Sequence, residues 1–160
     1  MYRIFQLTKA TADGKEGQSI YSYDSYLDAK GDYETKLGQF MDSDAFSSYA
    51  FFLLDNVGNI MDSNVFLAPV LNGDGLEVSR EAFRPRLFDV TQNADGTESA
   101  NIAPYDTAEK VEANFHKKYG SAIKNKAVSA IMLRGIDENA NPTVYTYWVR
   151  PIEAKEETNE

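Results

Sequence analysis

The amino-acid sequence predicts an α+β protein built from two tandem repeats, each a β-hairpin, a helix and a second β-hairpin (ββαββ). Three observations predict this fold class. The pattern Ala-Asp-Gly-x-Glu, then Ile, then Tyr-Asp occurs in residues 12–24 and returns in residues 94–106, at an offset of 82. Apolar residues at helical spacing follow each occurrence. A strongly apolar stretch of strand length comes next in both halves.

The composition is that of a folded globular protein, with 42% hydrophobic and 26% charged residues in a chain of 160. The absence of cysteine excludes disulfides and thiolate metal sites. A net charge of -9 argues against a nucleic-acid partner, because contact with phosphates needs a basic surface. The sequence shows no secretory signal and no apolar run long enough to span a membrane. We therefore expect a cytoplasmic or virion-associated protein without a membrane or nucleic-acid partner.

We divide the chain into a first ββαββ repeat at residues 1–68, a linker at 69–83, a second ββαββ repeat at 84–151 and an acidic tail at 152–160. The tail consists mostly of Glu, Lys, Thr and Asn and is predicted to be disordered. The first repeat has a net charge of -5 and the second a net charge of +1. The two repeats have therefore diverged in charge while they kept their apolar pattern.

The first hairpin of each repeat shows strand alternation and turn residues. Residues 3–9 alternate apolar and polar side chains, which predicts a strand. The equivalent residues 88–91 lie one residue further along the chain than the offset of 82 predicts, so the second turn should be one residue shorter. Asp13-Gly14 and Asp95-Gly96 supply tight-turn chemistry. Pro104 cannot donate a ladder hydrogen bond, which predicts that its strand lies at a sheet edge.

Helices are predicted near residues 25–41 and 107–124. Asp24 and Asp106 stand just before them and are predicted to be N-caps, whose carboxylates accept hydrogen bonds from the first turn. The apolar positions match pairwise at the common offset: Tyr26, Ala29, Tyr33, Leu37, Phe40 and Met41 with Ala108, Val111, Phe115, Tyr119, Ala122 and Ile123.

The strand after each helix, at residues 49–54 and 128–133, is apolar at nearly every position, which predicts burial on both faces. Closing strands are predicted at 60–67 and 143–150. One helix covers only one face of a four-stranded sheet, and the most economical cover for the other face is the sheet of the other repeat. We therefore expect two antiparallel sheets packed together, helices outside and a pseudo-twofold relation. One continuous sheet and a homodimer are the alternatives.

The linker contains part of a calcium-loop pattern. With Val70 at position one, Asn72, Asp74, Gly75 and Glu81 fall at positions three, five, six and twelve of an EF-hand loop. Position one lacks the required carboxylate, and the flanking helices are missing. A flexible loop is therefore the preferred interpretation.

No catalytic constellation stands out. His116 is the only histidine, and its neighbours Lys117 and Lys118 are typical of a solvated helix face. No paired carboxylates are distinct from surface acids, and no Gly-rich phosphate loop follows a strand. The sequence therefore predicts no catalytic residues, no metal site and no cofactor.

Aromatic residues in the last strand are a candidate surface. Tyr145 and Tyr147 share one face of that strand, and Trp148 points to the other. Such rings could stack on a sugar or anchor a partner. Filling of the core between the sheets is the favoured alternative.

The outer helix faces carry the second candidate surface. Seven residues are close to two helical turns, so side chains at this spacing form one stripe. The acidic stripe consists of Asp28, Thr35 and Asp42, and the basic stripe at the equivalent positions consists of Lys110, Lys117 and Lys124. Stripes of opposite charge could bring chains together head to tail. Two solvated faces that drifted apart in charge are the simpler explanation.

The whole pattern is similar to small uncharacterised proteins of bacteriophages and prophages from gut Gram-positive bacteria. The resemblance rests on the strand Ile4-Phe5-Gln6-Leu7-Thr8, the Asp-Gly hairpin, Tyr-Asp before the helix, and the apolar strand that runs into Asp55-Asn56-Val57-Gly58-Asn59. It implies a virion-associated or assembly role.

We therefore expect a non-enzymatic interaction or assembly protein that binds a protein partner or itself, such as a phage structural or accessory component. A small-molecule or glycan binding module that uses Tyr145, Tyr147 and Trp148 is the second hypothesis. A small enzyme is the third.

Overall fold

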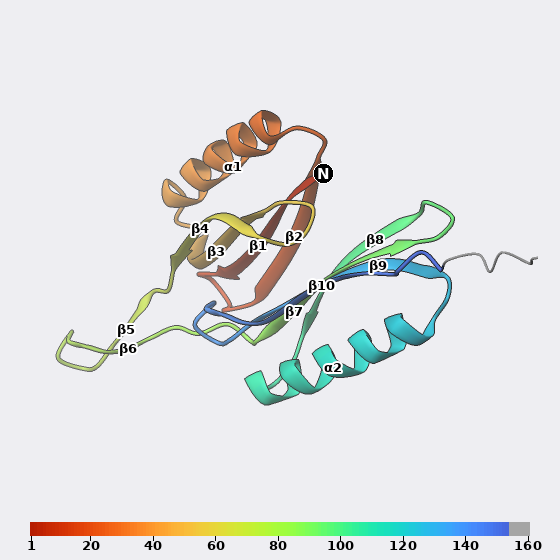
Figure 1. Cartoon of the computed structure of the whole chain (residues 1–160). Coiled ribbons are helices and arrows are strands. Elements are labelled where there is room, and N and C mark those ends of the chain that lie inside the picture. Colours follow the sequence, from red (N-terminus) through yellow and green to blue (C-terminus); the bar gives the residue numbers. More distant parts are fainter. Residues whose placement is uncertain (154–160) are drawn as a thin grey trace, which may run out of the picture.

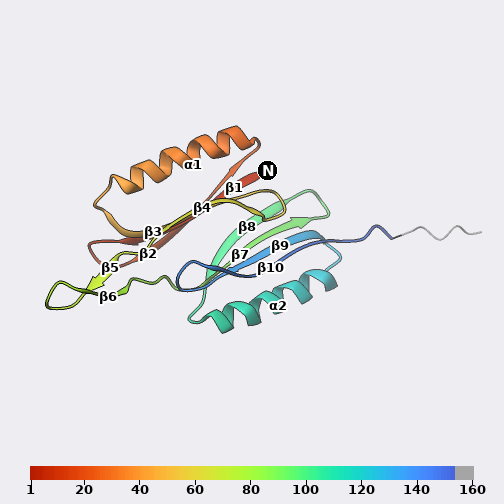
Figure 2. The same cartoon turned by 60° about the vertical axis from the view of Figure 1, so that its left-hand side comes forward.

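The computed structural model describes residues 1–153 and arranges them in four layers: a helix, two sheets and a helix (Figures 1 and 2). The first sheet has the order β2-β1-β3-β4, with β1 (Tyr2–Ala10), β2 (Glu16–Tyr23), β3 (Phe46–Leu54) and β4 (Ile60–Phe66). The second has the order β10-β9-β7-β8, with β7 (Arg86–Asn93), β8 (Glu98–Pro104), β9 (Val128–Ile136) and β10 (Pro142–Val149). Helices α1 (Tyr26–Met41) and α2 (Ala108–Lys124) cover the outer faces of the first and second sheet. The predicted pair of antiparallel ββαββ repeats is confirmed.

The inner faces of the two sheets form the central core, as predicted from strands that are apolar on both faces. One alternate set of residues on β1, β3, β7 and β9 meets in this core: Phe5, Leu7, Ala50, Phe52 and Leu54 with Phe88, Val90, Met132 and Ile136. The other set faces the helices, with Ile4, Phe51 and Leu53 under α1 and Leu87, Ile131 and Leu133 under α2. Each repeat therefore supplies the cover that the other repeat's inner face requires.

Two equivalent phenylalanines meet at the centre of this core. The rings of Phe5 and Phe88 are stacked, with centroids 4.5 Å apart and planes inclined by 14°. Phe52 packs edge-on against Phe88 at 5.7 Å. All three side chains are buried. The pseudo-twofold axis therefore passes close to a pair of rings at matching sequence positions.

Reciprocal ion pairs join the repeats beside the core. Arg3 of β1 pairs with Glu98 of β8, and Arg86 of β7 pairs with Glu16 of β2 at 3.5 Å. Arg3 and Arg86 are equivalent positions, as are Glu16 and Glu98, so each pair is the pseudo-symmetric image of the other. Both arginine side chains are buried, and a buried charge requires a partner. The pairs therefore fix how one sheet sits on the other.

The first turn of each repeat agrees with the sequence pattern. The β1–β2 turn spans residues 11–15, and the β7–β8 turn spans 94–97, which is one residue shorter as predicted. Gly14 and Gly96 have φ angles of 69° and 89°, a region that favours glycine. Strand β8, which ends at Pro104, is an edge strand as expected.

The predicted N-caps were wrong by one residue. Ser25 caps α1, and its hydroxyl accepts a hydrogen bond from the backbone N–H of Asp28 at 3.1 Å. Thr107 caps α2 in the same way. Hydroxyl and carboxylate side chains are both good caps, and the chain enters each helix at the hydroxyl residue. Asp106 instead pairs with Arg84 at 3.1 Å, beside the start of α2.

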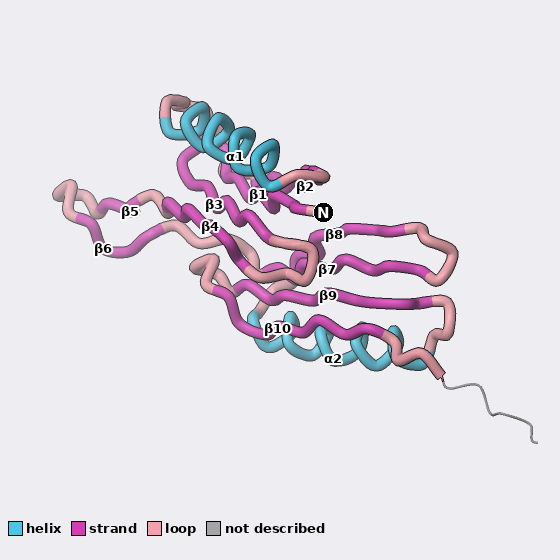
Figure 3. The backbone as a smooth tube through the Cα atoms, turned by 45° about the horizontal axis from the view of Figure 1, so that its top comes forward, coloured by secondary structure: helices cyan, strands magenta, loops and turns pink. Residues whose placement is uncertain are grey.

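The linker is not the expected flexible loop. It contains a two-stranded antiparallel hairpin, β5 (Pro69–Leu71) and β6 (Glu77–Arg80), that extends beyond the end of β4 (Figure 3). The tail prediction falls largely on residues 154–160, which lie outside the described residues. Within residues 1–153, no helix has the length and apolar character needed to cross a lipid bilayer.

We predict that Phe88→Ala will lower the free energy of unfolding by about 3–5 kcal/mol, because it opens a cavity at the centre of the core. Urea unfolding followed by circular dichroism measures this loss. Leu27→Ala, at a side chain that is 79% exposed, is the control and should change stability by no more than about 0.5 kcal/mol. A loss below about 1 kcal/mol for Phe88→Ala would contradict the central role of the stacked pair.

Candidate functional site

The β5–β6 hairpin, residues 69–80, projects from the molecule and is called the arm below (Figures 1 and 3). Every residue of the arm is exposed, and within the described chain its strands have no more than marginal contact with any other element. Its large apolar side chains are exposed by 39–63%: Val70, Leu71, Leu76 and Val78. A lone two-stranded hairpin is marginally stable in water. The arm therefore presents apolar surface that nothing within residues 1–153 covers.

Polar contacts tie the foot of the arm to the first sheet. One carboxylate oxygen of Glu81 accepts hydrogen bonds from the hydroxyls of Ser47 at 2.8 Å and Ser48 at 2.6 Å. The oxygen of Ser48 also accepts a bond from the backbone N–H of Ala68 at 2.9 Å. The hydrogen bond from Ser48, assisted by the one from Ser47, lowers the pKa of Glu81 below its ordinary value of 4.5. Both ends of the arm are thus held while its tip projects.

The residues of the calcium-loop pattern serve the hairpin instead. The side-chain oxygen of Asn72 accepts hydrogen bonds from the backbone N–H groups of Asp74 at 2.9 Å and Leu76 at 3.0 Å. Gly75 has a φ angle of 75°, which the turn requires. Glu81 is engaged by the two serines. Within residues 1–153, no cluster of three or more histidine or acidic side chains is placed to hold a metal ion.

The structure does not bring the three candidate aromatic residues together. Tyr147 packs against the core between the sheets, whereas Trp148 packs on the side of α2. The ring centroid of the exposed Tyr145 lies 4.2 Å from the guanidinium carbon of Arg134, and the Tyr145 hydroxyl donates a hydrogen bond to the carbonyl oxygen of Val57. Tyr145 therefore connects β10 to the β3–β4 turn of the other repeat.

The two charged stripes lie on opposite outer layers of the molecule, because α1 and α2 are the outermost elements (Figure 1). All six side chains are exposed: Asp28, Thr35 and Asp42 on the side of α1, and Lys110, Lys117 and Lys124 on α2. Lys110 is partly neutralised by Asp106 at 3.4 Å. The stripes are thus separate surfaces and do not form one site.

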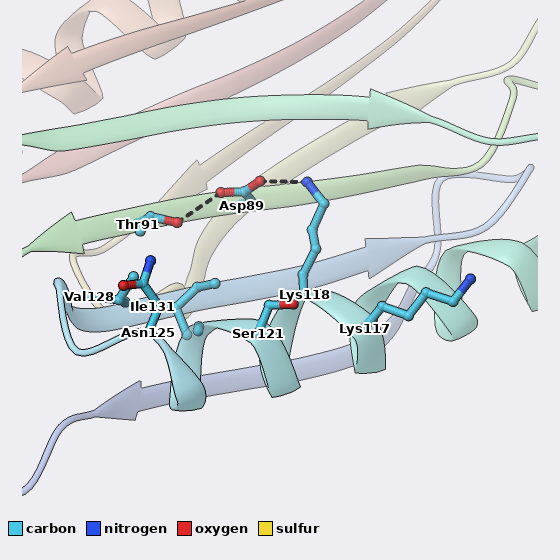
Figure 4. A pocket seen from close by; sticks show the side chains of 9 residues that line it. Asp89, Thr91, Lys117, Lys118, Ser121, Asn125, Val128 and Ile131 are labelled. Atoms are coloured by element: carbon cyan, nitrogen blue, oxygen red, sulfur yellow. Dashed lines mark hydrogen bonds and ion pairs between the residues drawn. The ribbon is translucent and has the colours of Figure 1, made fainter.

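A depression of about 340 Å³ lies between α2 and the second sheet (Figure 4). Lys118 reaches Asp89 across it at 2.9 Å, and Thr91 donates a hydrogen bond to the same carboxylate, while Lys117 extends in another direction. Asp89 is the one carboxylate in its lining, and Lys118 already neutralises it. Its lining thus lacks the second acidic group of a carboxylate pair. His116 is exposed on the same helix, outside this depression.

Comparison of the chain with protein-family models, curated proteins and solved structures found no match in any of the three. The candidate site therefore rests on the geometry of the molecule. The hairpin of the arm was not predicted, although the sequence contains a hairpin signal. Asn72-Gly73-Asp74-Gly75 lies between Val70-Leu71 and Leu76-Glu77-Val78, and turn residues flanked by apolar residues are typical of a hairpin.

We predict that Glu81→Gln will destabilise the fold at neutral pH and that this effect will fade in acid. Because the folded-state pKa of Glu81 is lowered, its carboxylate adds stability above the unfolded value of 4.5 and loses that contribution as the pH falls through the folded value. Urea unfolding across a pH series measures the difference in the free energy of unfolding between the wild type and Glu81→Gln. Glu77→Gln serves as control, because the Glu77 carboxylate is exposed and pairs only with the exposed Arg80 on the arm. A difference that stays constant as the pH falls below the folded-state pKa of Glu81 would contradict the pKa argument.

Proposed function

We propose that this is a non-enzymatic assembly protein that associates with a second copy of itself through the arm. The observation that carries the proposal is the exposure of Val70, Leu71, Leu76 and Val78 on a hairpin with no packing partner. Clusters of exposed apolar side chains mark contact sites in folded proteins, and these four lie within residues 70–78 of one hairpin. A contact that covers both strands would also supply the stability that an isolated hairpin lacks.

The outer edge of the first sheet offers the arm a matching surface. Strand β4 is an edge strand, so one row of its backbone N–H and C=O groups lacks a neighbouring strand in the sheet. Met61 and Val65 of this strand are exposed by 46% and 42%. An added strand pairs readily with such an edge through main-chain hydrogen bonds. Two copies that each place an arm on the other's β4 would form a closed dimer.

The resemblance to phage and prophage proteins favours a virion structural or accessory component as the setting for such contacts. The charged stripes on α1 and α2 offer a second, weaker mode of association. Exposed ion pairs contribute only about 0–1 kcal/mol each and are screened by salt. Apolar arm contacts persist in salt, so ionic strength separates the two modes.

We predict that the wild-type protein shifts from monomer to dimer as its concentration rises, in low and in high salt alike. The double substitution Leu71→Ser with Leu76→Ser should weaken this association at least about tenfold, because it removes two of the exposed apolar groups of the arm. Light scattering coupled to size-exclusion chromatography over a concentration series measures the change.

The matched control is Leu27→Ser with Ile152→Ser, which removes two exposed apolar side chains outside the arm and should leave association unchanged. A wild-type protein that remains monomeric at millimolar concentration would rule out the second copy as partner. Association that survives the arm substitutions but disappears in high salt would assign the contact to the charged stripes.

A further inference from the structure

An aromatic pocket lies at the C-terminal end of α1, away from the arm's apolar tip. It has a volume of about 310 Å³ and is lined by Phe40, Met41, Ser43, Phe46, Tyr49 and Phe66. The rings of Phe40 and Phe46 are 4.6 Å apart, and those of Tyr49 and Phe66 are 5.8 Å apart. Phe66 and Met41 are exposed by 43% and 68%, so this aromatic surface is open to solvent.

The second repeat shows what the equivalent place holds. There the guanidinium of Arg150 lies 4.9 Å from the ring centroid of Trp148, the counterpart of Phe66. Arg150 also donates hydrogen bonds of 2.8–3.0 Å to four carbonyl oxygens around the end of α2: those of Ala122, Ile123, Asn125 and Val128. Trp148 and these four residues are, in that order, the counterparts of Phe66, Phe40, Met41, Ser43 and Phe46. Five of the six residues that line the pocket thus correspond to residues that Arg150 contacts.

The first repeat has no arginine of its own at this place. The position equivalent to Arg150 is Ala68, whose methyl group cannot donate a hydrogen bond. Helix α1 has no basic residue in its last turn, whereas α2 has Lys124 there. The C-terminal end of a helix carries partial negative charge and favours a nearby cation. The end of α1 therefore lacks the neutralisation that Arg150 and Lys124 supply to α2.

The charge around the pocket is also reversed. Asp42 and Asp44, both exposed, flank Ser43 in the chain, and their counterparts are Lys124 and Lys126. Two carboxylates beside a helix C-terminus and a set of exposed rings favour a cation in the pocket. A guanidinium suits this place better than an ammonium, because it stacks flat on a ring and directs several N–H donors in one plane.

We propose that the pocket at the end of α1 binds an arginine side chain from a protein partner, in the way that the second repeat binds its own Arg150. The guanidinium stacks on Phe66 and donates hydrogen bonds to the carbonyl oxygens at the end of α1, while Asp42 and Asp44 supply counter-charge. The pocket shares strand β4, through Phe66, with the edge proposed to receive the arm. It contains none of the arm's apolar residues and does not depend on association through the arm.

The test is a titration of the whole protein with N-acetyl-arginine amide, followed by ¹H–¹⁵N NMR. We expect saturable shifts at residues 40–46 and 66, with a dissociation constant on the order of 1–10 mM for a single exposed side chain. N-acetyl-lysine amide and the uncharged N-acetyl-citrulline amide should each bind several-fold more weakly. Shifts that do not saturate, or equal binding of the lysine or citrulline probe, would overturn the assignment to arginine.

Two variants add a second readout, the melting temperature, to the binding of the probe. Ala68→Arg supplies the missing guanidinium within the chain, so it should abolish the saturable shifts and raise the melting temperature by roughly 2–4 °C. Ala94→Arg makes the same charge change at an exposed turn residue and should leave both quantities unaltered. An Ala68→Arg protein that still binds the arginine probe like the wild type would overturn the proposal, whatever the state of the arm.

Discussion

The burial of two apolar sheet faces against each other is the constraint on which every other layer depends. Each repeat has one helix and two apolar sheet faces, so a single repeat would leave in water either Phe5, Leu7 and Phe52 or Phe88, Val90 and Met132. Full burial of such a side chain contributes about 1.5–3 kcal/mol. The reciprocal pairs Arg3–Glu98 and Arg86–Glu16 then specify the orientation of the two sheets, because a shift of one sheet would leave a buried guanidinium without its carboxylate.

Much of this fold could be predicted from the sequence, because the signals are periodic and occur twice. The apolar strands at 49–54 and 128–133 indicated that both faces are buried, and one helix per repeat left the other sheet as the cover. Local choices between similar groups could not be predicted in this way. Asp24-Ser25 offers two good caps side by side, and only the entry of the chain into α1 decides between them.

The candidate surfaces were harder to predict, because their properties depend on contacts between distant residues. Alternation assigned Tyr145 and Tyr147 to one face of a strand, but it could not place Tyr145 on Arg134 and against the turn at Val57. The arm was misjudged because residues 69–83 were compared with a calcium loop, and a flexible loop was preferred once that pattern proved incomplete. The relation between Ala68 and Arg150 is visible in the sequence offset, yet its meaning depends on carbonyl groups that only the folded α2 presents to the guanidinium.

The pseudo-symmetric ion pairs have the form of a contact between two identical chains, in which every substitution is made on both sides at once. Fusion into one chain removes this coupling, because each side is then encoded separately. It also makes the pairing of the halves intramolecular and so independent of protein concentration. Phe5 and Phe88 have remained a matched pair, whereas Ala68 and Arg150 have become unlike. A single gene can thus keep a symmetric interior while the surfaces at the ends of its two helices become chemically different.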